Sequence, residues 1–283
     1  MQRERHPGQK PSVERICREF SITRDAYYKN SKRYQHRELL EEQVLDLVRP
    51  KRRIQSREGT RKLYYGIKKD LDRMELKVGR DKLFDILRKH DMLVKPRKKY
   101  VNTTNSKHMF YAHNNLVKDF IPTGKNQLWV TDITYIRTLD GFLFLALITD
   151  AYSRKIVGYD ISDSLELEGA LRALRKALSR LPAGHKLIHH SDRGIQYCSH
   201  AYISKLKSRG IRVSMAAKGN CYENAMAERM NGILKQEYYL DQNFKTKTIA
   251  KKTCKEAVTL YNSLRLHMSL GYKTPNHVHD KAA

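Results

Sequence analysis

From residue 128 onward, apolar residues follow first the two-residue period of strands and then the longer period of helices, which restricts the folds open to the chain. Three strand patterns come first, at 128–136, 142–150 and 155–161. Helix and strand patterns then alternate, at 165–181 (helix), 186–190 (strand), 201–208 (helix), 212–215 (strand) and about 222–239 (helix). We therefore expect a mixed α/β domain in which three antiparallel strands precede the alternating elements.

The stretch before this domain combines helical periodicity with a high positive charge. Residues 51–100 hold 18 Lys or Arg against 7 Asp or Glu. Apolar residues recur at three- and four-residue steps over 63–71 and again over 83–87, with a turn around Gly79 between them. Two short helices with a tight junction are typical of a helix-turn-helix, whose second helix enters the DNA major groove. An ordinary helical hairpin with a basic surface is the alternative.

These patterns divide the chain into four parts. We expect a helical N-terminal segment at 1–50, a basic helix-turn-helix-like domain at 51–95, a linker at 96–120 and the α/β core at 121–283. The linker region opens with the basic residues Arg97, Lys98 and Lys99, which suit an arm that tracks DNA phosphates.

Composition excludes several classes of protein. Lys plus Arg exceed Asp plus Glu by 56 − 30, a net charge of +26, which indicates a polyanionic partner such as nucleic acid. The longest apolar run, 142–148, is far shorter than the ~20 residues of a membrane helix. Residues 1–20 lack the apolar segment of a signal peptide, and the four cysteines form no C-x-x-C pair, which argues against structural zinc.

Three acidic residues stand out against this basic background. Asp132 interrupts a β-rich run, where Asp is normally depleted, and Asp192 follows the apolar strand pattern that ends at 190. Glu228 shares one face of a helix with three other polar residues, Asn224, Asn231 and Lys235. Taken singly, each acid can be explained without a function, as a solvated residue or as a turn residue. Clustered carboxylates, however, are the ligands that hard divalent cations prefer.

Such a cluster supports phosphoryl transfer. Two Mg²⁺ ions about 3.5–4 Å apart can activate an attacking oxygen and stabilise the leaving oxygen. The sequence contains no Walker A or GxGxxG motif and no arrangement typical of a nucleophilic Ser or Cys.

The motifs around these acids resemble a known family. They are Trp129-Val-Thr-Asp132-Ile-Thr-Tyr135, His190-Ser-Asp192-Arg-Gly194-Ile-Gln-Tyr197 and Asn224-Ala-Met-Ala-Glu228, with Lys235 seven residues later. Together they resemble the DDE region of retroviral-type integrases and, more narrowly, the second-frame (OrfB) transposase of the IS-three insertion-sequence family. The 35 residues between Asp192 and Glu228 match that family's spacing. Residues 261–275 resemble its C-terminal signature, except that Leu266 stands where the family usually has Pro.

The resemblance implies a ribonuclease-H-like core that cleaves and joins DNA strands. Its catalytic and metal-binding acids carry over to Asp132, Asp192 and Glu228, which would hold two Mg²⁺ (or Mn²⁺) ions. The residues that we expect to contact DNA are Lys235, Arg193, Asn224, Arg97, Lys98 and Lys99. Asp150 is the chief rival metal ligand, and we interpret it as a turn residue at a strand end. A DNA-binding regulator with an inactive core and a ribonuclease of the same fold remain alternatives.

The expected partners are the terminal inverted repeats of an element, target DNA and further copies of the chain. No heptad pattern persists over three or four repeats, so an upstream-frame product could supply additional DNA binding and multimerisation. The expected location is the bacterial cytoplasm, in association with the nucleoid.

Overall fold

The computed structural model describes residues 12–95, 113–118, 120–182, 184–216 and 225–281. The chain divides into two compact units. The helical unit comprises residues 1–54 and 63–93, and the sheet unit comprises residues 55–62 and 94–283. None of the described helices is long and apolar enough to cross a membrane.

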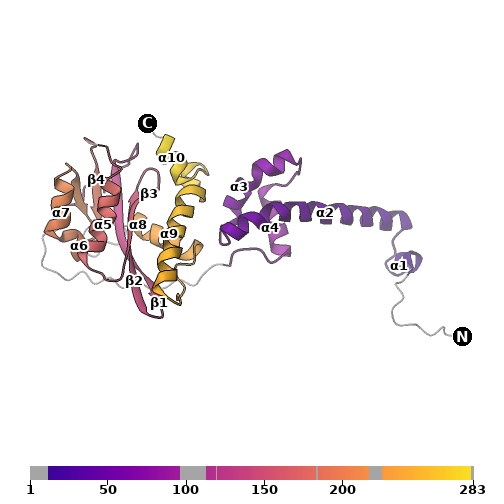
Figure 1. Ribbon diagram of the computed structural model, residues 1–283. Helices are drawn as coiled ribbons and strands as arrows, with labels where there is room; N and C mark the ends of the chain where they lie inside the picture. Colours follow the sequence, from indigo (N-terminus) through magenta and orange to yellow (C-terminus); the bar gives the residue numbers. More distant parts are fainter. Residues whose placement is uncertain (1–11, 96–112, 119, 183, 217–224, 282–283) are drawn as a thin grey trace. The chain divides into compact units, whose positions relative to one another are not determined.

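The described residues of the helical unit form four helices (Figure 1): α1 Val13–Glu19, α2 Arg24–Ile54, α3 Thr60–Arg73, of which residues 60–62 belong to the sheet unit, and α4 Arg80–Lys89. Helices α3 and α4 are the pair that the periodicity predicts. Their buried leucines and isoleucines share a core with Val44, Leu45 and Val48 of α2. Helix α2 therefore continues past residue 50, where the sequence suggested a boundary, and its C-terminal half packs with the basic pair.

A five-stranded sheet forms the centre of the sheet unit. Its strands are β1 Leu128–Thr138, β2 Gly141–Asp150, β3 Ile156–Ser162, β4 Ile188–Ser191 and β5 Arg212–Met215, in the order β3-β2-β1-β4-β5. The first three are antiparallel, and β4 and β5 run parallel to β1. This arrangement confirms the predicted α/β, ribonuclease-H-like fold class.

Helices cover both faces of this sheet (Figure 1). They are α5 Leu167–Leu178, α6 Ile195–Cys198, α7 His200–Lys207, α8 Ala225–Glu237, α9 Lys247–Leu264 and α10 Pro275–Lys281, with a short 3₁₀ turn at Met268–Leu270. One core lies between the sheet and α5 to α7, and a second lies between the sheet and α8 and α9. Ile133 packs in the first core and Ile136 in the second. Because successive strand residues point to opposite faces, Asp132 shares the α8 face with Ile136.

The outer edge of β3 is closed by side chains instead of another strand. Asn262 accepts a hydrogen bond from the backbone N–H of Ile156 at 2.9 Å and donates one to its carbonyl at 3.0 Å. Lys176 donates to the carbonyl of Tyr159 at 3.1 Å. Such contacts satisfy backbone groups that would otherwise invite another strand to pair.

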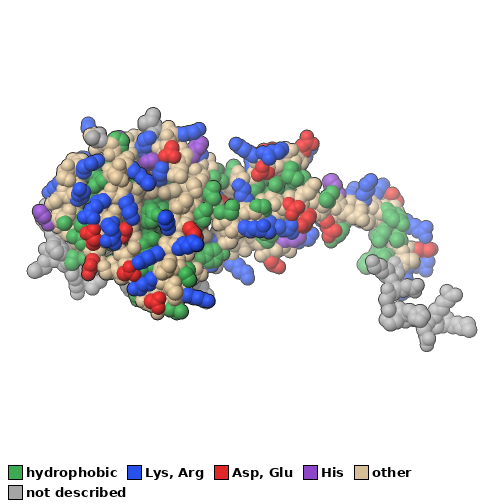
Figure 2. Space-filling model, viewed as in Figure 1, with side chains coloured by type: hydrophobic (Ala, Val, Ile, Leu, Met, Phe, Trp, Pro, Cys, Tyr) green, Lys and Arg blue, Asp and Glu red, His purple; other side chains and the backbone are tan. Residues whose placement is uncertain are grey.

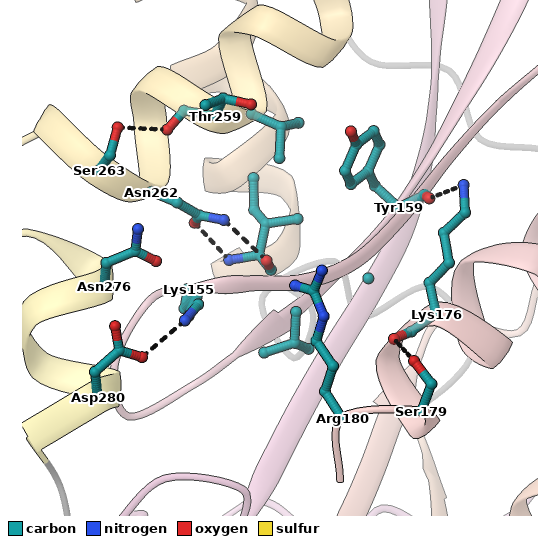
Figure 3. A pocket seen from close by; sticks show the side chains of 14 residues that line it. Lys155, Tyr159, Lys176, Ser179, Arg180, Thr259, Asn262, Ser263, Asn276 and Asp280 are labelled. Atoms are coloured by element: carbon teal, nitrogen blue, oxygen red, sulfur yellow. Dashed lines mark hydrogen bonds and ion pairs between the residues drawn. The ribbon is translucent and has the colours of Figure 1, made fainter.

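A pocket of about 520 Å³ lies beside this edge (Figure 3). It is polar and basic, and Lys155 at its rim pairs with Asp280 at 3.0 Å. None of the three candidate acids lines it.

Gly158 allows β3 and α5 to pack closely, and its replacement provides a test of this packing. A Cβ on Gly158 would collide with the carbonyl oxygen of Ala173 and lie 2.8 Å from the Cβ of Ala177. We expect Gly158→Ala to lower the free energy of unfolding by about 1–3 kcal/mol, as overpacking does. Gly232→Ala is the matched control, because a Cβ there meets open space and alanine favours a helix. Urea unfolding that shows equal stability for Gly158→Ala and the wild type would contradict this packing.

Candidate active site

Two parallel strands bring Asp132 and Asp192 side by side. In the ladder between β1 and β4, Val130 pairs with His190. Asp132 follows Val130 by two residues, and Asp192 follows His190 by two residues. Since β4 ends at Ser191, Asp192 begins the loop at the carboxyl end of that strand, next to the middle of β1.

Helix α8 brings the third acid to the same place. Asn231 on this helix donates a hydrogen bond from Nδ2 to Oδ2 of Asp132 at 2.7 Å, and the backbone N–H of Ile133 donates to Oδ1 at 2.9 Å. Glu228 lies one turn before Asn231 and therefore on the same side of the helix. Met230 and Leu234 are buried in the core below and fix the helix against the sheet.

The three carboxyl groups influence one another electrostatically. Burial raises the pKa of Asp132 to about 7, and the negative charges of Asp192 and Glu228 add to the increase. Burial also raises the pKa of Glu228, with Asp192 as the second cause. The strand pairing and the Asn231 contact bring the three acids into one neighbourhood, where like charges disfavour ionisation.

The loop after β4 holds Asp192 through backbone contacts. The N–H of Gly194 donates to Oδ1 of Asp192 at 2.9 Å. Arg193 donates from Nε to the carbonyl of Ala216 at 2.9 Å and so connects this loop to the residues after β5. His190 is fully buried and lies 2.9 Å from the hydroxyl of Ser214. Arg193 and His190 thus make contacts that support the loop.

Lys235 is the predicted DNA contact that the structure brings to the acids. It lies two turns after Glu228 on α8. Burial lowers its pKa, and the nearby Asp132 carboxylate opposes that change. Its ammonium group stands 5.4 Å from the centre of the Tyr135 ring. Arg193 is a second expected contact and directly follows Asp192, whereas the remaining four, Asn224, Arg97, Lys98 and Lys99, lie outside the described residues.

The sequence is similar to known proteins over most of its length. Two models described as integrase core domain match residues 122–221 and 209–275. A 31 kDa protein of insertion element IS600 from Shigella sonnei, described as uncharacterized, is 36% identical over 92% of this chain and 96% of its own length. The transposase of IS629 from the same species is 32% identical, over 92% and 88%. Transposase InsF of IS3A from Escherichia coli K12 is 36% identical, over 69% and 68%.

The chain belongs to the IS3 family of insertion-sequence transposases. The resemblance read from the motifs is thereby confirmed. The transposase has an integrase-type core and belongs to the polynucleotidyl transferases.

Asp150 has a structural part in the transposase. Its side chain is fully buried at the end of β2. Oδ2 accepts from the N–H of Asn126 at 2.7 Å, and Oδ1 accepts from the N–H and the hydroxyl of Ser153 at 2.7 and 2.6 Å. Although burial raises its pKa, hydrogen bonds from His279 and Ser153 bring the net value below the ordinary one. Both oxygens serve the turn between β2 and β3.

The C-terminal signature of the transposase is also structural. Arg265 donates to both oxygens of Glu237 at 2.8 and 2.7 Å, and Lys62 donates to the same carboxylate at 2.9 Å. Tyr261 donates its hydroxyl hydrogen to the carbonyl of Arg154 at 2.8 Å. Because Glu237 is the last residue of α8, these contacts anchor the end of the helix that carries Glu228.

Sequence reasoning placed Asn231 on the polar helix face but gave it no function. The structure makes it the direct partner of Asp132 and leaves its Oδ1 buried without a hydrogen-bond partner among the described residues. Its position three residues after Glu228 was the available signal.

The acids themselves are the candidate ligands for a metal ion. Within the part of the chain that the structure describes, no three His, Cys, Asp or Glu side chains form a ready-made metal site. The carboxylates of Asp132, Asp192 and Glu228 lie near one another, but they are not close enough together to bind one ion as they stand. Their chemistry suits a hard divalent cation, since they supply oxygen ligands whose mutual repulsion a cation would relieve.

The raised pKa of Asp132 predicts a pH-dependent stability of the metal-free transposase. The native carboxyl titrates at about pH 7, against 3.8 ordinarily, so it stabilises the fold below pH 4 and that contribution is lost as pH rises through 7. We therefore expect Asp132→Asn to be more stable than the wild type at pH 8 in EDTA, by on the order of 1–3 kcal/mol, and equal to it at pH 4. Urea unfolding at the two pH values measures this difference.

Asp163→Asn is the control for that measurement. Asp163 is an exposed carboxylate that pairs with Lys251, and this contact lowers its pKa. Its replacement should bring no gain at pH 8. A wild type that is more stable than Asp132→Asn at pH 8 would show that the buried, ionised Asp132 carboxylate does not destabilise the fold.

Proposed function

We propose that the transposase cleaves and transfers DNA strands at the ends of its insertion sequence, with Asp132, Asp192 and Glu228 as the ligands of catalytic Mg²⁺ (or Mn²⁺). The hydrogen bond from Asn231 to Asp132 is the observation that carries this proposal. It joins α8 to β1 and thereby brings Glu228 to the two strand carboxylates. Asp192 reaches the same place through the parallel pairing of β1 and β4.

Each of these residues has a definite task in the proposed reaction. Two divalent ions, when bound, would activate the attacking oxygen and stabilise the leaving oxygen of an in-line displacement. Asn231 and the N–H of Ile133 hold the Asp132 carboxylate in one orientation, and the N–H of Gly194 does so for Asp192. Lys235 would bind a phosphate beside the scissile bond. The attacking group is first water and then a DNA 3′-OH.

DNA binding would use the charge of the whole chain and a few dedicated elements. Lys and Arg side chains are spread over the visible surface of the sheet unit (Figure 2), and the net charge is +26. We assign terminal-repeat binding to the α3–α4 pair and phosphate tracking to Arg97, Lys98 and Lys99. Arg193 and Asn224 would support DNA near the acids, and association with the nucleoid would follow from the same charge.

Strand transfer at two element ends requires two active sites in one assembly. We therefore propose that the transposase acts as a homo-oligomer, which raises the effective concentration of one end near the other. A product of an upstream frame would add further DNA binding and multimerisation.

The acids are tested by conservative replacement. We expect Asp132→Asn, Asp192→Asn and Glu228→Gln each to abolish Mg²⁺-dependent cleavage of element ends and to leave DNA affinity largely intact, because binding depends mainly on the positive charge. Asp163→Asn should remain active. Gel assays of cleavage and gel shifts measure the two properties. Near-normal cleavage by one of the three variants would remove that residue from the metal site.

The basic arm is tested by replacing Arg97, Lys98 and Lys99 with alanine. We expect weaker binding to every DNA sequence and a flatter dependence of affinity on salt, because phosphate contacts carry little sequence information. Affinities measured over a range of salt concentrations decide this. Loss of preference for the terminal repeats alone, with unchanged affinity for other DNA, would contradict the assignment.

A further inference from the structure

Two aromatic rings lie exposed on the hairpin of β1 and β2. Tyr135 of β1 and Phe142 of β2 meet edge to face, with ring centres 6.0 Å apart. Their exposed fractions are 48% and 51%, although aromatic side chains are usually buried in cores or interfaces. The rings form a small apolar surface that the described part of the chain does not cover.

Positive charge accompanies these rings. The ammonium group of Lys235 stands 5.4 Å from the centre of the Tyr135 ring. Arg137 is exposed and follows Tyr135 by two residues, so it lies on the same face of β1. Flat apolar rings flanked by cations are the combination with which proteins bind single-stranded nucleic acid, because bases stack on the rings and phosphates pair with the cations.

The aromatic surface and Asp132 lie along the same edge of strand β1. Strand β1 pairs with β4 only from Leu128 to Val130, and the next bridge on that edge joins Thr138 to Phe244. Among the described residues, the intervening edge has no strand partner. It contains Asp132, whose side chain lies on the α8 face of the sheet, and, three residues further, Tyr135, whose side chain lies on the opposite face. Lys235 connects the two, because it follows Asn231, the hydrogen-bond partner of Asp132, by one turn of α8, and its ammonium group stands 5.4 Å from the centre of the Tyr135 ring.

We propose that Tyr135 and Phe142 form a stacking site for one unpaired DNA base next to the phosphodiester that the acids receive, with Lys235 and Arg137 bound to the adjacent phosphates. This proposal rests on the proposed function, since it concerns the DNA strand at the same site. A paired base in a duplex hides its faces in the stack, so only an unpaired base can lie on the rings. Stacking tolerates every base, so the site would hold the strand without reading its sequence.

The test compares DNA affinities of full-length variants in EDTA. The probe is a fluorescent duplex with a short unpaired 3′ tail, read by anisotropy. We expect Tyr135→Leu and Phe142→Leu to bind it about tenfold more weakly than the wild type, as loss of base stacking does. Their affinity for a blunt duplex and the slope of affinity against salt should not change, because the rings contact no phosphate.

Two controls separate stacking from a general change at the surface. Tyr135→Phe keeps the ring and should bind like the wild type. Leu139→Ala removes a 70% exposed apolar side chain from the same hairpin and should also have no effect. Thermal unfolding confirms that the variants are folded.

Abasic replacement in the tail identifies the base itself. Replacing one tail base with an abasic site should weaken wild-type binding about tenfold and should not weaken Tyr135→Leu further. Additive losses would overturn the proposal, as would wild-type affinity in both leucine variants. Equal losses on blunt duplex would overturn it in favour of contact with the duplex backbone. A lower mass of Tyr135→Leu in light scattering, without any abasic effect, would overturn it in favour of a second copy of the chain.

This assay distinguishes failure of the stacking site from failure of the proposed function, because it contains no metal and measures no cleavage. If the wild type fails to cut element ends but shows the abasic effect, the proposed function fails and the stacking site stands. If the wild type cuts and the abasic effect is absent, only the stacking site fails.

Discussion

The hydrogen bond between Asn231 and Asp132 connects helix α8 to strand β1, and the geometry of the acidic site depends on this connection. Glu228 is one helical turn away, so the position of the amide also sets the position of the third carboxylate. The core beneath supports the same arrangement, because Met230 and Leu234 of α8 share a buried cluster with Ile136 of β1. Packing and polar contact together place side chains that are almost a hundred residues apart in sequence.

Asp150 and Asp132 belong to the same sheet, but the donors and charges around their carboxylates differ. This difference distinguishes a structural carboxylate from the proposed metal ligand. Asp150 is surrounded by donors from Asn126 and Ser153, and its pKa is lowered. Asp132 has two donors, but burial, reinforced by two acidic neighbours, raises its pKa to about 7. A folded chain tolerates such unfavourable electrostatics where the rest of the core supplies the stability. A bound cation would neutralise these carboxylates and remove their repulsion, and this relief would favour cation binding.

Much of the fold follows from the sequence, whereas the contacts inside the site do not. All five strands and the helix of Glu228 match their periodic patterns to within a few residues, because alternation and helical spacing are local signals. Helix α9 was missed, although its buried residues recur at helical spacing: Ala250, Cys254, Ala257, Val258 and Tyr261. The partnership of Asn231 with Asp132 could not be read, since it depends on how α8 packs across β1. The ion pair of Arg265 with Glu237 could not be predicted either, because it too depends on how distant segments pack.

Binding of Mn²⁺ to the full-length transposase, followed by the loss of the free-ion signal in electron paramagnetic resonance, tests the central claim most directly. The account predicts up to two ions per chain in the wild type, and a large loss of affinity in each of Asp132→Asn, Asp192→Asn and Glu228→Gln. It also predicts unchanged binding in Asp163→Asn. Wild-type Mn²⁺ affinity in all three acid variants would show that these carboxylates do not form a metal site.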